Sequence, residues 1–255
     1  MKTSTIRLIV TVVTAAWSVL FANYPAVAGP KDLLDRLTGK TATLRIVVND
    51  ISASVPGHDP RELFMRSSKQ FLSAAEAGDT LAVTTIGEQM TERVRVEKFN
   101  IGKTGRAFDD KKLRIDRTAE ALKAAEKSVE HLRAPRSRYL ETLRALQQDV
   151  ATARASGMTV LVRINGDALE NGVANFENDK LDDASAAELI ARLKKEGTLI
   201  AVPPAGGKAL PPLQLSFVGV GGGSAAKYER VERFWRKYAE ACGAIITHYG
   251  VTIPG

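Results

Sequence analysis

Short runs of apolar and β-branched residues recur along the chain, each too short for a helix of ordinary length. They predict strands over residues 43–49, 80–86, 94–101, 159–164, 213–220 and 244–249. Between most of these runs, apolar residues repeat at helical spacing instead. This second pattern predicts helices over residues 59–77, 116–133, 138–156, 184–196 and 228–241.

Helices that repeatedly return the chain to apolar strands indicate an α/β protein. We expect a Rossmann-like, doubly wound and mostly parallel central sheet with helices on both of its faces. In such sheets ligands bind at the carboxyl ends of the strands, near the point where the strand order reverses. The loops that directly follow strands are therefore where functional side chains are to be sought.

The N-terminus has the pattern of a secretory signal peptide over residues 1–28. Lys2 and Arg7 supply the positive charge, an apolar run covers residues 8–21, and Ala-Val-Ala at 26–28 offers small residues for cleavage. The apolar run is shorter than the ~20 residues that span a bilayer, which favours a cleaved signal over the alternative of an uncleaved membrane anchor. We expect cleavage between Ala28 and Gly29 and an exported protein, periplasmic or secreted.

The remaining residues, 29–255, are predicted to form a single domain without a transmembrane span, because no second long apolar run follows. The single cysteine, Cys242, excludes a disulfide framework and fits a buried structural thiol. Three scattered histidines do not have metal-ligand spacing. The formal net charge of +7 is spread too thinly to indicate a nucleic-acid partner.

The first predicted strand ends in a cluster of oxygen-bearing side chains. Asp50, Ser52 and Ser54 lie at positions i, i+2 and i+4 of one turn. A carboxylate with two hydroxyls is the kind of donor set that Mg²⁺ prefers. The alternative is a polar turn in which Ser54 or Asp59 only caps the following helix. A later strand also ends in an acidic loop, and if the two strands are neighbours, Asp167 faces the Asp50 turn.

With these motifs, the chain resembles a von Willebrand factor A (vWA) domain with a metal-ion-dependent adhesion site. The resemblance rests on the sequence DISAS after the first strand, on the order of strands and helices, and on the late segment FVGVGGGS…VERFWRKYAEACGA, which is similar to bacterial exported members. It implies that Ser52 and Ser54 bind a Mg²⁺ or Mn²⁺ ion directly. Asp50 and Asp167 would bind it directly or through water.

The family usually supplies one further ligand, a threonine, from the loop before the helix that leads into the Asp-bearing strand. This chain has Ser137 there, between Arg136 and Arg138. Ser137 offers the same hydroxyl chemistry, whereas two positive charges beside a cation oppose metal binding unless they point away. The resemblance thus implies five metal ligands: Asp50, Ser52, Ser54, Ser137 and Asp167.

The function implied is that of a non-enzymatic protein-binding module of the cell envelope. In the family, the metal ion accepts a Glu or Asp side chain from the partner protein, so that recognition depends on the metal. The first alternative is a metal-free structural or assembly protein that keeps this fold but has lost the site.

Enzymatic alternatives fit the sequence less well. A phosphohydrolase of the haloacid dehalogenase type needs a second acid two residues after the nucleophilic Asp50, where this chain has Ser52. Neither candidate serine lies in a G-x-S-x-G motif, which argues against a serine hydrolase. The glycine run at 219–223 lacks the last glycine of the dinucleotide motif, and we interpret it as a tight turn between strand and helix.

Overall fold

The computed structural model describes residues 41–52, 60–86, 95–130, 137–176, 181–202, 210–221 and 224–254. The predicted signal sequence and residues 53–59, with Ser54 and Asp59, lie outside the described residues. The strands are β1 (Thr43–Asp50), β2 (Thr80–Ile86), β3 (Glu97–Asn100), β4 (Thr159–Asn165), β5 (Leu213–Val218) and β6 (Ile245–Gly250). The helices are α3 (Pro60–Ser73), α4 (Ala107–Val129), α5 (Tyr139–Ala145), α6 (Gln147–Ala155), α7 (Asp183–Lys195) and α8 (Ala225–Ala241).

The six strands form one sheet in the order β3-β2-β1-β4-β5-β6. All neighbouring pairs are parallel except β2 and β3, which are antiparallel. The strand order reverses between β1 and β4, and Asn49 at the end of β1 lies opposite Asn165 at the end of β4. The predicted α/β sheet is thereby confirmed, and so is the condition that the strands before Asp50 and Asp167 are neighbours.

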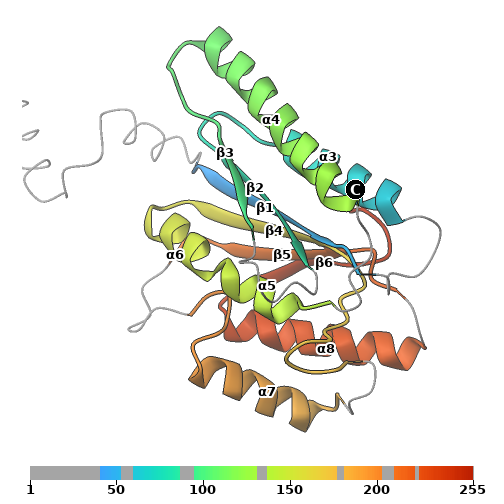
Figure 1. Cartoon of the computed structure of the whole chain (residues 1–255). Helices are drawn as coiled ribbons and strands as arrows, with labels where there is room; N and C mark the ends of the chain where they lie inside the picture. The colour runs from blue at the N-terminus through green and yellow to red at the C-terminus, as the bar shows by residue number, and fades with distance from the viewer. Residues whose placement is uncertain are drawn as a thin grey trace, which may run out of the picture. The chain divides into compact units, whose positions relative to one another are not determined.

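Helices cover both faces of the sheet (Figure 1), as the alternating pattern predicts. The α3 and α4 helices pack on one face over a small apolar cluster that includes Val47, Phe71 and Leu81. The other face carries the main core, to which α5, α6, α7 and α8 contribute. The α7 helix packs against α8.

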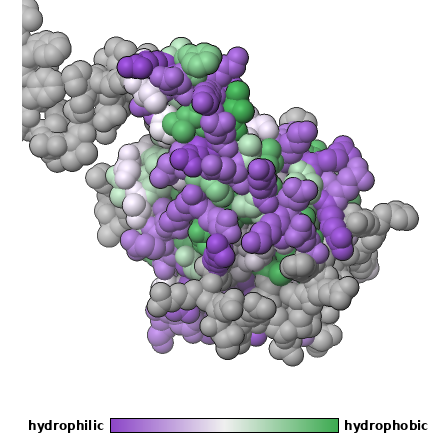
Figure 2. All heavy atoms as spheres, turned by 45° about the horizontal axis from the view of Figure 1, so that its top comes forward, coloured by the Kyte–Doolittle hydropathy of each residue, from purple (hydrophilic) through white to green (hydrophobic). Residues whose placement is uncertain are grey.

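Two predicted helices have different boundaries in the structure. The α4 helix begins at Ala107, nine residues before the predicted start. Its buried positions are only Ala121, Ala125 and Val129, all in its second half. Its first half buries no large apolar side chain, so hydrophobic spacing cannot reveal it; Phe108 is 78 % exposed. Figure 2, in which the top of Figure 1 is turned forward, shows a mostly hydrophilic surface there.

The segment predicted as one helix over residues 138–156 is divided into α5 and α6. The break lies at Leu146, which ends one helix and precedes the next, and whose side chain is completely buried. The third strand is also shorter than predicted and covers only Glu97–Asn100. None of the helices in the described segments is long and apolar enough to cross a membrane.

Candidate functional site

The first predicted motif forms a buried turn at the carboxyl end of β1. Asp50 is completely buried and Ser52 is 2 % exposed. The Ser52 backbone N–H donates a hydrogen bond to Asp50 Oδ1 over 2.8 Å. The Ile51 N–H donates to the Ile86 carbonyl at the end of β2. The turn is thus held on both sides, and the carboxylate and hydroxyl of the motif lie together.

Ser137, predicted as the hydroxyl from a separate loop, lies against this turn. It precedes Arg138, the N-cap residue of α5, and it is completely buried. Its Oγ is 2.7 Å from Ser52 Oγ and 3.1 Å from Asp50 Oδ2. The guanidinium of Arg138 pairs with Glu141 at 2.9 Å. One of the two positive charges that oppose metal binding is therefore matched by a carboxylate on its own helix.

Asp167 joins the cluster through Tyr139, a residue that the sequence analysis did not select. The Tyr139 hydroxyl is 2.6 Å from Asp50 Oδ2 and 3.2 Å from Asp167 Oδ1, and it accepts a hydrogen bond from the Ala168 N–H. A hydroxyl has one proton, so Tyr139 donates to one carboxylate at a time. Its position two residues after Ser137 is the only sequence signal, and a tyrosine filling the core would look the same.

The loop after β4 is packed closely and has an unusual backbone. Ala168 is completely buried and has φ of 64°, in the left-handed region that non-glycine residues rarely adopt. Its carbonyl accepts a hydrogen bond from Trp235 Nε1 at 2.9 Å. The Asp167 carboxylate accepts a hydrogen bond from the Leu169 N–H. The core aromatic of α8 thereby holds the loop that presents Asp167.

An amide pair joins the two strands beneath the cluster. Asn165 Nδ2 donates to Asn49 Oδ1 at 2.7 Å, and Asn49 Nδ2 donates to Ser128 Oγ of α4 at the same distance. Both asparagines are completely buried. These hydrogen bonds fix the carboxyl ends of β1 and β4 against each other. Both hydrogen bonds lie on the side of the sheet that α4 covers, so the asparagines position the site but contribute no ligand atom to it.

The cluster contains two carboxyl groups and is removed from water. Burial is the main cause that raises the pKa of Asp50, against the hydrogen bonds from Tyr139, Ser52 and Ser137, which lower it. The pKa of Tyr139 is well above its usual value because of burial and the nearby Asp50 and Asp167 charges. No Lys or Arg of the described segments forms an ion pair with Asp50.

The donor atoms suit a hard divalent cation. The two carboxylates and the two serine hydroxyls are all oxygen donors, the class that Mg²⁺ and Mn²⁺ bind. The part of the chain that the structure describes has no cluster of three or more His, Cys, Asp or Glu side chains arranged for a metal. A cation here would therefore depend on the hydroxyls of Ser52 and Ser137.

Glu170, in the same acidic loop, has a structural role. It is completely buried, and its carboxylate accepts hydrogen bonds from the N–H groups of Leu140 at 2.8 Å, Gly172 at 2.7 Å and Val173 at 2.9 Å. The carboxylate thus ties the loop to the first turn of α5. Burial outweighs these hydrogen bonds and raises the pKa of Glu170 to about 7.

We expect the raised pKa of the Glu170 carboxyl to make the protein less stable as the pH rises. A raised pKa means that the folded state holds the Glu170 proton more tightly than the unfolded chain does. The stabilisation is complete below the unfolded pKa of about 4.5 and is lost as the pH passes about 7. Urea unfolding should show a decrease of up to about 3 kcal/mol between pH 5 and pH 8.

Glu170→Gln should make this dependence less steep, with the remainder caused by the raised pKa of Asp50. Glu188→Gln, at an exposed position of α7, should leave it unchanged. If the unfolding free energy of Glu170→Gln depends on pH as steeply as that of the unaltered protein, Glu170 is not the group responsible.

The sequence matches no protein-family model and no curated protein. Solved structures with a similar fold include the human COPII-coat protein Sec24c (TM-score 0.42, 12 % identity) and the manganese-loaded Plasmodium vivax TRAP protein (TM-score 0.38, 13 % identity). A third is the N-terminal domain of TFIIH p34 (TM-score 0.36, 8 % identity). Each alignment covers 82 % of this chain, and the chain spans 29 %, 68 % and 92 % of the three structures respectively. At these similarities none of them assigns a site or partner to this chain.

Proposed function

We propose that the chain is an exported, non-enzymatic vWA-type module that binds a partner protein through a divalent cation. The observation that carries this proposal is the meeting of four side chains from three separate segments: Asp50 and Ser52 at the end of β1, Ser137 before α5, and Asp167 after β4. Asp167 is joined to the others through the Tyr139 hydroxyl. Ser54, the fifth predicted ligand, lies outside the described residues. Export is supported by the charge, apolar run and cleavage pattern of residues 1–28.

The residues have distinct tasks in this proposal. Asp50 and Asp167 supply negative charge in a site from which burial removes water. Ser52 and Ser137 supply neutral oxygen donors, which keep the total negative charge low. A bound Mg²⁺ or Mn²⁺ supplies a coordination position that attracts an acidic side chain of the partner. Glu170 holds the loop of Asp167 in place without joining the donor set.

A second candidate, a metal-free structural or assembly protein, is favoured by Tyr139. Its hydroxyl already bridges Asp50 and Asp167, so the carboxylates have a hydrogen-bond donor that replaces a cation. The four candidate ligands described in the structure are each no more than 2 % exposed. A site that has lost its metal would keep both the Tyr139 hydrogen bonds and the burial of these side chains, because both stabilise the fold.

Calorimetric titration with Mg²⁺ and Mn²⁺ separates the two candidates. We expect the mature protein to bind one ion per chain and the Asp50→Ala variant to bind none while remaining folded. Asp116→Ala, at an exposed position of α4, is the matched control and should bind normally. Tyr139→Phe removes the competing hydroxyl and should retain a response to the ions.

If the unaltered protein is folded but releases or absorbs no heat of binding with either ion, the metal-free function is favoured. Magnesium-dependent release of phosphate from model esters would instead support the phosphohydrolase that the sequence argues against.

A further inference from the structure

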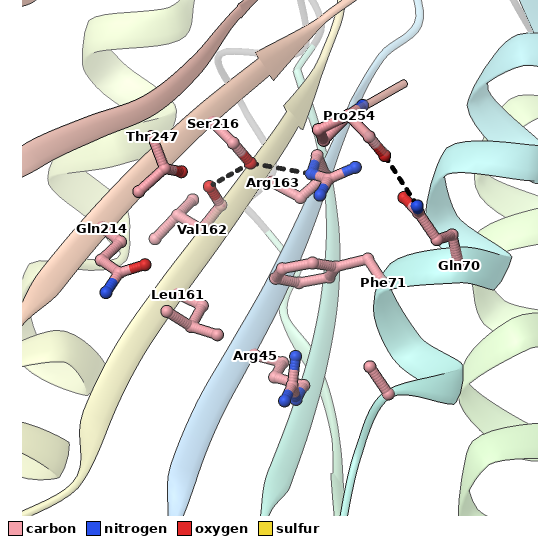
Figure 3. A pocket seen from close by; sticks show the side chains of 11 residues that line it. Arg45, Gln70, Phe71, Leu161, Val162, Arg163, Gln214, Ser216, Thr247 and Pro254 are labelled. Carbon is pink, nitrogen blue, oxygen red and sulfur yellow. Dashed lines mark hydrogen bonds between the residues drawn. The ribbon is translucent and has the colours of Figure 1, made fainter.

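A second polar site lies on the other face of the sheet, away from the strand ends. It is a cavity of about 300 Å³ between α3 and strands β1, β4, β5 and β6. Figure 3 shows Arg163 close to Ser216, with the Phe71 ring of α3 beside it and Gln214 and Thr247 on the neighbouring strands. None of the eleven residues that line the cavity is acidic.

Arg163 is a charged residue in the middle of an otherwise apolar strand. It is only 7 % exposed, and its guanidinium lies 5.0 Å from the centre of the Phe71 ring. Its Nε donates to Ser216 Oγ at 2.7 Å, and its Nη1 donates to Ser67 Oγ at 3.2 Å. Both partners are neutral, and no acidic residue in the described segments forms an ion pair with Arg163.

A buried charge without a counter-charge is costly, so it needs an explanation. The neighbouring Arg45 shows the ordinary solution, since its guanidinium pairs with Asp79 at 3.3 Å. Burial lowers the pKa of Arg163 to about 10, which leaves the group positively charged at neutral pH. The two serines and the Phe71 ring hold this charge in a fixed orientation, and Nη2 has no partner among the described residues.

We propose that this cavity binds a small oxyanion, either a carboxylate or a phosphate group of a soluble molecule. The planar guanidinium of Arg163 presents the paired N–H groups that such anions accept. Gln214 lines the same cavity and adds an amide donor, whereas the Thr247 hydroxyl donates to the Leu215 carbonyl. Phe71, Ala74 and Leu161 provide an apolar wall for the carbon part of the ligand.

Thermal unfolding in the presence of anions tests the proposal. We expect millimolar sodium phosphate or sodium succinate, with EDTA present, to raise the Tm by about 3 °C relative to sodium chloride of equal ionic strength. The two anions distinguish the ligand sources: a response to phosphate alone indicates a phosphate ester, and a response to succinate alone indicates a carboxylic acid. Arg163→Met should lose the shift.

Further variants make the result specific to the cavity. Arg144→Met, an exposed arginine of α5 on the opposite face, should keep the full shift. Gln214→Leu leaves the guanidinium in place, removes the amide donor and should weaken binding several-fold, which keeps the test valid if Arg163→Met does not fold. Asp50→Ala should also keep the shift, since the strand-end cluster is a different site. The absence of any shift beyond that of chloride, or an equal shift in Arg163→Met, would overturn the proposal.

Discussion

Replacing Gly166 with alanine is expected to destabilise the protein by at least about 3 kcal/mol. A Cβ atom at this position would lie against the Tyr139 hydroxyl and 2.6 Å from Cβ of Asp50. Neither neighbour has room to move, because the hydroxyl is fixed by hydrogen bonds from and to three groups and Asp50 is completely buried at a strand end. Urea unfolding of the variant measures the loss directly.

Gly102→Ala is the matched control for this substitution. A Cβ at Gly102 would meet only a Leu113 methyl group at 3.5 Å, which is ordinary contact, so its stability should change by less than about 0.5 kcal/mol. The Gly166 variant should also lose any binding of Mg²⁺ or Mn²⁺, because the added Cβ displaces the Asp50 side chain from the cluster. A Gly166→Ala variant as stable as the control would show that Tyr139 and Asp50 leave room for a methyl group beside Gly166.

Truncating Trp235 to alanine should cost about 4 kcal/mol of unfolding free energy. The side chain is completely buried in α8, and its ring packs against five aromatic neighbours at centroid distances of 5.1 to 6.3 Å: Tyr139, Phe176, Phe217, Phe234 and Tyr238. The substitution leaves a large cavity in the main core. It also removes the hydrogen bond to the Ala168 carbonyl. Thermal and urea unfolding, followed by circular dichroism, measure the effect.

Trp235→Phe separates packing from the hydrogen bond. The smaller ring keeps most of the aromatic contacts but leaves the Ala168 carbonyl without its donor, for a cost of about 1–2 kcal/mol. If the variant is as stable as the unaltered protein, the tryptophan N–H does not hold the loop. If the alanine variant loses no more than the phenylalanine variant, the aromatic packing contributes little.

The sheet and much of the cluster could be predicted because both depend on patterns that are continuous in sequence. The apolar runs of β1 and β4 gave the strands, and the known chemistry of strand ends directed attention to Asp50 and Asp167. Ser137 was selected only through the resemblance to the vWA family, which implies a hydroxyl ligand from the loop before this helix, and the structure brings it within 2.7 Å of Ser52. The burial of Cys242 also agrees with the prediction of a structural thiol.

The residues that the sequence did not reveal are those whose roles arise from contacts between distant segments. Tyr139 lies 89 positions from Asp50, and nothing in its local pattern distinguishes it from a core tyrosine. Arg163 interrupts an apolar strand, but only the fold shows that its neighbours are two serines and a phenylalanine ring. The start of α4 was not predicted because that part of the helix hardly contacts the core. Its sequence therefore lacks the helical spacing of apolar residues.

The left-handed backbone of Ala168 has a consequence for genetic screens on this protein. That conformation costs about 1 kcal/mol and persists because Trp235 and Tyr139 fix the peptide groups on its two sides. Random mutagenesis scored by partner capture would therefore recover α8 substitutions among its loss-of-binding alleles. Alleles at Trp235, 67 positions from the loop in sequence, would look like interface residues. A parallel readout of protein abundance would identify them as supports of the loop rather than points of contact.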